Sequence, residues 1–196
     1  MSEVYNIPFT TAPILVDAIK DNAWTGGEVH TTNHIVLGED LLSQPKDASM
    51  QWNLCWDTAY LYFWFEVKDD MLVADEILPE DNWKDDCLEI WLDGNYSRDE
   101  AIDENSDYGL QYRYNPVETA DPVRVAIGAF GLSSEILQSA EVTGNGFVLE
   151  TAIPLRALGI EPYDSTLIGF DLDYNDDDDG GELDSKLKLF AAFDDA

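Results

Sequence analysis

The chain has 196 residues, of which 45% are hydrophobic and 12% aromatic, so it can bury a core and is not a long disordered segment. Its 41 acidic residues against 10 basic ones give a formal net charge of −31, which makes nucleic acid and anionic membranes poor partners. A solvated surface is the simplest explanation of this charge. The negative charge does not oppose the binding of uncharged ligands such as sugars, and it attracts divalent cations.

The first half of the chain is predicted to consist mainly of strands. Residues 4–7 indicate a first strand, and the loose alternation over 30–37 indicates an edge strand. Residues 49–56 carry large apolar side chains at alternate positions, and 60–67 form an aromatic run without Gly or Pro. The last two segments together predict a β-hairpin whose second strand is central and buried on both faces.

The second half continues with short strands separated by polar turns, and one short helix is predicted at 154–159, with Pro at its start and Gly at its end. The strands are expected at 87–92, 109–115, 123–130, 140–142, 146–153, 166–174 and 187–193. Because helices do not alternate with strands, the predicted fold class is all-β. We expect one antiparallel β-sandwich, jelly-roll-like, of roughly ten strands, over residues 1–196.

Catalytic and redox motifs do not stand out in the sequence. It contains no G-x-S-x-G, H-E-x-x-H, P-loop or G-x-G-x-x-G pattern. His30 and His34 occur in a strand-like segment, where residues four apart are about 13 Å apart, so they are not a predicted metal pair. With 41 acidic residues, a glycosidase-like pair of carboxylates would arise by coincidence. Cys55 and Cys87 could pair if their strands are neighbours, or could be buried free thiols.

The acidic run Asp176–Asp179, followed by Gly180-Gly181-Glu182, indicates a candidate cation site. It does not fit an EF-hand, because with Gly180 in the glycine position the twelfth residue is Lys186 rather than Glu. A calcium site of another kind and a solvated turn both remain open. For calcium, the predicted ligands are Asp69, at the end of the aromatic strand, with Asp176 and Asp178.

Trp83 is the leading candidate for a binding residue. It lies in the polar loop 80–86, directly before a predicted strand, with few apolar sequence neighbours to bury it. An indole ring there can stack on the C–H face of a sugar, whose hydroxyls are then bound by carboxylates, amides or guanidinium groups. The alternative is a Trp folded back as a cap on the sandwich, and the local sequence favours neither.

Six motifs in order resemble the family 9 carbohydrate-binding modules, over about residues 12–194. The segment from Trp83 to Asp93, WKDDCLEIWLD, resembles the family pattern W-x-x-D-x-x-E-[IL]-x-[IL]-D and is the most specific of them. The others are Ile14-Leu15-Val16-Asp17 with Trp24, the central segment 56–69, and the segments 111–115, 146–154 and 168–176.

The resemblance implies a jelly-roll sandwich with structural calcium and a site that holds glycan chain ends between two aromatic rings. Carried over by position, Trp83 would be one ring, and Glu89, Arg113 and Asn115 would bind sugar hydroxyls. Asp173 stands where the family can carry Gln, which removes amide donors. The second Trp of the clamp and the last strand would lie beyond Ala196, with Phe193 a weak substitute, so we expect this chain to lack its last strand.

The predicted function is therefore non-catalytic binding of polysaccharide or oligosaccharide chains, with chain ends as the expected target. The module would direct a covalently linked catalytic domain, such as that of a xylanase, to its substrate, outside the cell or at its surface. No membrane helix and no signal peptide are recognisable in the chain. Two alternatives are a calcium-binding structural or adhesion module without glycan affinity, and a haem-binding redox domain using Met50 or a His, although no haem attachment motif is present.

Overall fold

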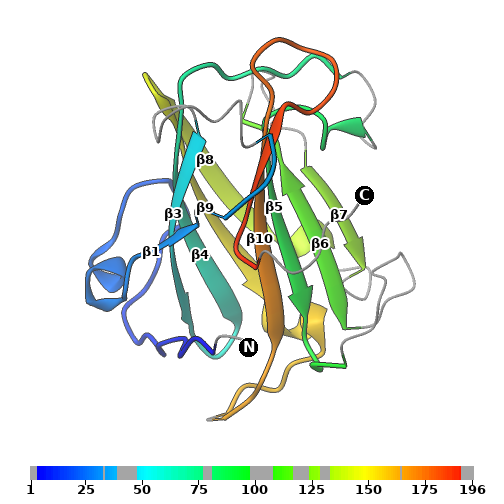
Figure 1. The fold of residues 1–196 in the computed structure, drawn as a ribbon. Helices are drawn as coiled ribbons and strands as arrows, with labels where there is room; N and C mark the ends of the chain where they lie inside the picture. The colour runs from blue at the N-terminus through cyan, green and yellow to red at the C-terminus, as the bar shows by residue number, and fades with distance from the viewer. Residues whose placement is uncertain are drawn as a thin grey trace.

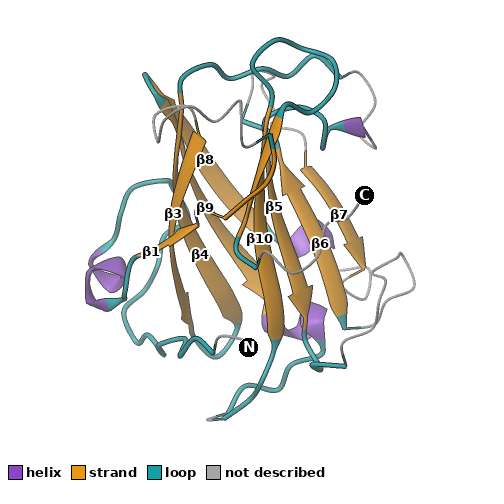
Figure 2. Ribbon diagram, viewed as in Figure 1, coloured by secondary structure: helices purple, strands orange, loops and turns teal. Residues whose placement is uncertain are grey.

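The computed structural model of the protein describes residues 4–32, 34–38, 48–76, 81–97, 108–116, 124–128, 133–163 and 165–190. These residues form two sheets packed face to face (Figures 1 and 2). In spatial order, the first sheet contains β1 (His30–Thr32), β3 (Ala48–Trp56), β4 (Tyr60–Asp69), β9 (Gly146–Pro154) and β8 (Leu137–Thr143). The second contains β2 (His34–Leu37), β11 (Ser185–Lys188), β10 (Gly169–Asp176), β5 (Cys87–Asp93), β6 (Gly109–Tyr114) and β7 (Arg124–Gly128).

Every pair of neighbouring strands in these two sheets is antiparallel, which confirms the predicted all-β sandwich. The helices among the described residues are short 3-10 helices: η1 (Asn22–Gly26), η4 (Ser133–Glu135) and η5 (Leu155–Leu158). The last of these is the predicted short helix, with Pro154 before it and Gly159 after it at a positive φ of 63°. None of the helices in the described ranges is long and apolar enough to cross a membrane.

The aromatic strand β4 is central and buried on both faces, as predicted. Phe63 and Phe65 point into the core between the sheets, with rings stacked at 5.7 Å. On the opposite face Trp64 packs in a second cluster with Trp24. The segment around Trp24 covers this outer face because the buried Glu150 carboxylate accepts hydrogen bonds from the Trp24 indole, at 3.0 Å, and from the backbone of residues 17 and 18.

The predicted first strand at 4–7 is wrong. The segment follows the same edge of β3 that β1 occupies, and it adds one isolated bridge between Phe9 and Trp56. Pro8 and Pro13 have no backbone N–H to continue a ladder. Tyr5 instead packs edge-on against Trp52, with ring centroids 5.4 Å apart.

Other boundaries also differ from the prediction. The expected strand over 30–37 is two strands, because the chain crosses from the first sheet to the second between β1 and β2. The last described strand, β11, ends at Lys188, and Phe193 lies outside the described residues. Cys55, on β3, and Cys87, on β5, are buried free thiols on different sheets, so the disulfide alternative is wrong.

Truncation of Phe63 tests the importance of the core. Phe63 is fully buried between the sheets, so Phe63→Ala removes buried apolar area and leaves a cavity. We expect the free energy of unfolding in urea to fall by about 3–5 kcal/mol. The exposed Val142, on β8, provides the control, and Val142→Ala should change it by less than about 0.5 kcal/mol. A Phe63→Ala protein as stable as the control would contradict this packing.

Candidate functional site

The loop from Asp81 to Asp86 is held on the second sheet by three amide or guanidinium groups. Arg113 Nη1 donates to Asn82 Oδ1 at 3.0 Å, and Asn175 Nδ2 donates to the Trp83 carbonyl at 2.6 Å. Asn115 Nδ2 donates to Asp85 Oδ2 at 3.1 Å. The anchored loop leaves the Trp83 side chain 39% exposed, so Trp83 is not a buried cap.

Strand register brings the other predicted binding residues together. Glu89 on β5 pairs with Arg113 on β6 and with Asp173 on β10. Their neighbours along each strand, such as Leu88 and Leu172, point into the core, so all three point to the outward face of the sheet. The structure thus aligns Arg113, Glu89 and Asp173 in one row, beside the loop that carries Trp83.

This row is a buried network of opposite charges. Arg113 Nε lies 4.0 Å from Glu89 Oε1, and Lys186 Nζ lies 3.2 Å from Asp173 Oδ2. Lys188 Nζ is 3.6 Å from the same Asp173 oxygen. Glu89 is 3% exposed and Asp173 is fully buried, so each charge depends on these partners rather than on water.

Burial changes the acidity of this network. Desolvation raises the pKa of Glu89 above its ordinary value, although the Lys186 and Arg113 charges oppose the shift. Burial, followed by the charge of Asp173, raises the pKa of Asp171 from 3.8 to about 7. The ion pairs nevertheless place charged donors, the side chains of Arg113, Lys186 and Lys188, beside carboxylate acceptors on this face.

Two buried amide atoms beside Trp83 have no hydrogen-bond partner among the described residues. They are Nδ2 of Asn82 and Oδ1 of Asn175, one donor and one acceptor. Buried polar groups are nearly always hydrogen-bonded in native proteins. Hydroxyl groups of a ligand, or water, can satisfy these two atoms. Sequence reasoning missed both residues, because neither differs in type from the many other Asn and Asp residues of the chain.

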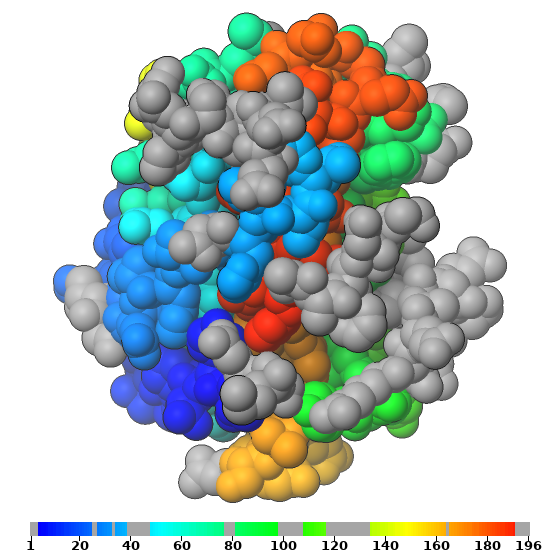
Figure 3. Space-filling model, viewed as in Figure 1, coloured from blue at the N-terminus to red at the C-terminus, as the bar shows by residue number. Residues whose placement is uncertain are grey.

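Two acidic loops meet at one end of the sandwich, where Figures 1 and 3 show residues 70–76 beside residues 176–184. Gly180 allows the close approach, because a Cβ added there would lie 2.8 Å from Asp75 Oδ2. Within the described ranges, four groups of carboxylates have one oxygen each within 4.8 Å of one another. They are Asp69/Asp86/Asp176, Asp69/Asp70/Asp178, Asp75/Asp85/Asp177 and Asp177/Asp179/Asp184.

The electrostatics of these groups suit a bound cation. Desolvation raises the pKa of Asp69 to about 6, and desolvation together with the charge of Asp69 raises the pKa of Asp86 to about 9. The Tyr174 hydroxyl donates to both carboxylates, at 2.5 Å and 3.3 Å. The side chain of Asp177 is fully buried, and its Oδ2 has no hydrogen-bond partner among the described residues. Closely spaced carboxylate oxygens are ligands for hard divalent cations, so these residues fit a metal.

All three predicted metal ligands lie in these groups, Asp69 with Asp176 in one and Asp69 with Asp178 in another. Sequence analysis missed Asp85 and Asp86, and it included Asp177 only as a member of the 176–179 run. Asp85 and Asp86 occur inside the most specific sequence motif, directly before β5, and that was the available signal.

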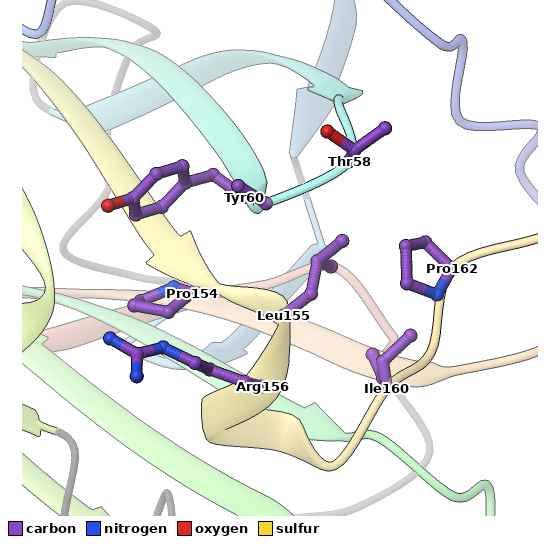
Figure 4. A pocket seen from close by; sticks show the side chains of 8 residues that line it. Thr58, Tyr60, Pro154, Leu155, Arg156, Ile160 and Pro162 are labelled. Atoms are coloured by element: carbon purple, nitrogen blue, oxygen red, sulfur yellow. The ribbon is translucent and has the colours of Figure 1, made fainter.

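Two hollows lie away from these residues. One, of about 260 Å³, lies around η5 at the opposite end of the molecule, lined by Tyr60, Leu155, Arg156 and their neighbours (Figures 1 and 4). The other, of about 510 Å³, lies on the first sheet between residues 14–16 and 136–138. Neither hollow is lined by a residue of the polar row or of the acidic groups.

A family model described as carbohydrate family 9 binding domain-like matches residues 16–196. The chain belongs to this family. The resemblance seen in the sequence motifs is thereby confirmed, and membership makes this a carbohydrate-binding domain rather than an enzyme.

Relatives of this family 9 domain include parts of much larger proteins. Over 168 residues it is 30% identical to an exoglucanase of Acetivibrio thermocellus, covering 86% of this chain and 14% of that protein. Over 169 residues it is 32% identical to endo-1,4-beta-xylanase C of Paenibacillus barcinonensis, covering 84% and 13%. The chain thus spans about one-seventh of the length of these relatives.

The fold agrees with solved structures of the same family. A family 9 module from Caldicellulosiruptor kristjanssonii in complex with cellotriose superposes with a TM-score of 0.73 at 23% identity, covering 94% of this chain and 83% of that one. The same module in complex with glucose also gives a TM-score of 0.73, covering 94% and 84%. This likeness establishes the sandwich fold of the family 9 domain.

The raised pKa of Asp171 predicts a pH-dependent stability. Between about pH 4 and 7 the folded protein keeps the Asp171 proton while the unfolded chain releases it, so this group makes unfolding easier as the pH rises. Asp171→Asn removes the titration and keeps Oδ1, which accepts from the backbone of Leu172 and Phe190. We expect the variant to gain stability over the wild type by up to about 1.4 kcal/mol per pH unit in this window.

Urea denaturation at pH 4.5 and pH 8 measures this difference. The variant should match the wild type most closely at pH 4.5 and be the more stable protein at pH 8. The exposed Glu161 provides the control, since Glu161→Gln should give the same small difference at both pH values. A constant difference between Asp171→Asn and wild type at the two pH values would refute the assignment.

Proposed function

We propose that this family 9 domain binds the ends of neutral polysaccharide or oligosaccharide chains at the outward face of the second sheet. The observation that carries the proposal is the in-register row of Arg113, Glu89 and Asp173 beside the exposed ring of Trp83. The two carboxylates of this row have positive partners in Arg113, Lys186 and Lys188, so the face carries little net charge. Such a face suits hydroxyl groups better than a charged sugar. The relatives bound to glucose and cellotriose support the same ligand class.

In this site Trp83 would stack on a sugar ring, because its side chain is the partly exposed aromatic surface of the 81–86 loop. Glu89 would accept from hydroxyls and Arg113 would donate to them. Asn115 would act mainly by holding the loop, because its amide already donates to Asp85. Asp173 would orient the donors around it through its ion pair with Lys186.

We propose that the four groups of carboxylates bind calcium. Calcium accepts several carboxylate oxygens in flexible arrangements, and it would offset the repulsion among Asp69, Asp86 and Asp176. A cation held by Asp75, Asp85 and Asp177 would also fix the two loops at this end of the sandwich. Asp85 belongs to one of these groups and also accepts from Asn115, so the cation and the sugar site would share a residue.

The domain would act as part of a longer, extracellular polysaccharide-degrading protein. The matched relatives are named as an exoglucanase and a xylanase, of which this domain corresponds to a small part. Binding to the polymer would raise the local concentration of a linked catalytic domain at its substrate. The polysaccharides that glucanases and xylanases degrade lie outside the cell, so the domain would act there.

A second candidate function is a calcium-dependent structural or adhesion module without glycan affinity. The number of acidic groups in the 70–76 and 176–184 loops favours it. Like the glycan-binding module, a structural module would be stabilised by calcium. Unlike the glycan-binding module, it would give no heat of binding with sugars.

Removal of the Trp83 ring tests glycan binding. In calorimetric titrations with glucose, cellobiose and xylobiose, Trp83→Ala should lower affinity at least about 10-fold, because stacking on an aromatic ring is lost. Reduced alditols should bind more weakly than the parent sugars if chain ends are recognised. Tyr163→Ala removes an exposed ring outside the polar row and should bind like wild type. Equal binding by Trp83→Ala and wild type would exclude Trp83 from the site.

Chelation tests the cation proposal. Dialysis against EDTA should lower the thermal unfolding midpoint by several degrees, since uncompensated carboxylates then face one another, and added calcium should restore it. Asp177→Asn keeps Oδ1, which accepts from residues 179 and 180, but should reduce the response to calcium. Glu141→Gln, on the exposed part of β8, is the matched control.

The same chelated protein should bind cellobiose more weakly, because Asp85 links one carboxylate group to Asn115. An unchanged midpoint with and without calcium would contradict the cation proposal. A calcium-dependent midpoint combined with no heat from any sugar would favour the structural module instead.

A further inference from the structure

Position 173 leaves the candidate sugar site short of a donor. A carboxylate only accepts hydrogen bonds, so Asp173 cannot donate to a hydroxyl as an amide would. Asp173 and Glu89 are register partners, and two neighbouring acceptors require donors from elsewhere. The guanidinium of Arg113 is on the far side of Glu89 from Asp173, across the row.

Lys186 supplies a donor at this place. Its Nζ is 3.2 Å from Asp173 Oδ2, and its charge is the largest influence that lowers the pKa of Glu89. Lys186 therefore pairs directly with Asp173 and acts electrostatically on Glu89. An ammonium group carries three N–H donors, so one ion pair leaves donors for a ligand.

The register also places Lys186 beside the anchor of Trp83. Lys186 on β11 pairs with Asn175 on β10, whose amide donates to the Trp83 carbonyl. From β11 across β10, the outward face holds first Lys186, then Asn175, and then the loop that carries Trp83. Asn175 thus lies between the backbone of Trp83 and Lys186, and Lys186 also reaches Asp173 of the row.

Burial separates the roles of the two lysines near Asp173. The Lys188 side chain is 4% exposed, and its Nζ lies between Asp171 and Asp173 at 4.0 Å and 3.6 Å, as expected for a counter-ion. The Lys186 side chain is 16% exposed, so it is the lysine that solvent reaches. Basic residues are also scarce: the chain has 10, and three of them, Arg113, Lys186 and Lys188, lie on this face.

We propose that Lys186 is a specificity-determining residue that donates a hydrogen bond to one hydroxyl of the sugar unit held at Trp83. It would replace the amide donors that Asp173 does not provide. The inference rests on the proposed function, because it concerns the same site. A hydrogen bond from a charged donor contributes a factor on the order of 10 to 100 in affinity.

The experiment is calorimetric titration of glucose, cellobiose and the monodeoxyglucoses on the calcium-loaded protein and four variants. Lys186→Met removes charge and donor, and Lys186→Gln removes the charge but keeps a donor. Lys186→Met with Asp173→Leu removes the ion pair as a whole without adding a hydrogen-bond donor at position 173. Lys20→Met breaks a more exposed ion pair, Lys20 Nζ with Glu66 Oε1 of β4 at 2.9 Å, away from the second sheet and is the control. Thermal midpoints establish that each variant is folded.

We expect Lys186→Met to bind glucose about 10-fold or more weakly, with Lys186→Gln between it and wild type. One monodeoxyglucose should bind wild type and Lys186→Met equally, which identifies the hydroxyl concerned. Recovery of affinity in the double variant would mean that Lys186 only neutralises Asp173, and would overturn the inference. Equal glucose binding by wild type and Lys186→Met would overturn it as well, while leaving the proposed function intact. No heat from any sugar with the wild type would overturn both.

Discussion

The inward packing of the second sheet is the constraint on which the site depends. Leu88, Tyr112, Leu172 and Leu187 come from four neighbouring strands and are all buried against the first sheet. Because side chains alternate along a strand, burying these residues directs their neighbours to the opposite face. A slip of one residue in any of these strands would exchange core residues for charged ones. The hydrophobic core therefore sets the register, and the register brings the charged side chains of β6, β5, β10 and β11 together.

The acidic end of the sandwich is a second consequence of the same sheet. β10 ends in the 176–184 loop beside the start of β5, so Asp176 and Asp177 lie next to Asp85 and Asp86. The repulsion of so many buried carboxylates opposes folding in the absence of a cation. A bound cation would turn this repulsion into a cross-link between two loops. The loop that carries Trp83 is tied to both regions, through Asn175 and through Asp85.

A chain with a net charge of −31 nevertheless concentrates three of its ten basic residues on one face. Exposed acidic groups keep the surface solvated at little cost. On the outward face of the second sheet, however, Glu89 and Asp173 are buried and need positive partners. The resulting network of donors and acceptors is suited to an uncharged ligand rich in hydroxyl groups.

The sequence by itself determined the strands with strong local patterns, such as β4 and β5, and it singled out Trp83 in its polar loop, because these depend on local pattern. Its motifs also carried the family resemblance, and that resemblance, rather than the residues alone, made Glu89 and Arg113 candidates. The sequence also identified Asp69 and the run Asp176–Asp179 among the acids, but not Asp85 or Asp86 as their partners. Only the tertiary structure decided that residues 4–7 add no strand, that residues 30–37 divide between two sheets, and that Asn82, Asn175 and Lys186 lie beside the candidate site. The physical reason is that strand pairing joins residues far apart in the chain, and the side chains that meet across neighbouring strands leave no mark in the local sequence.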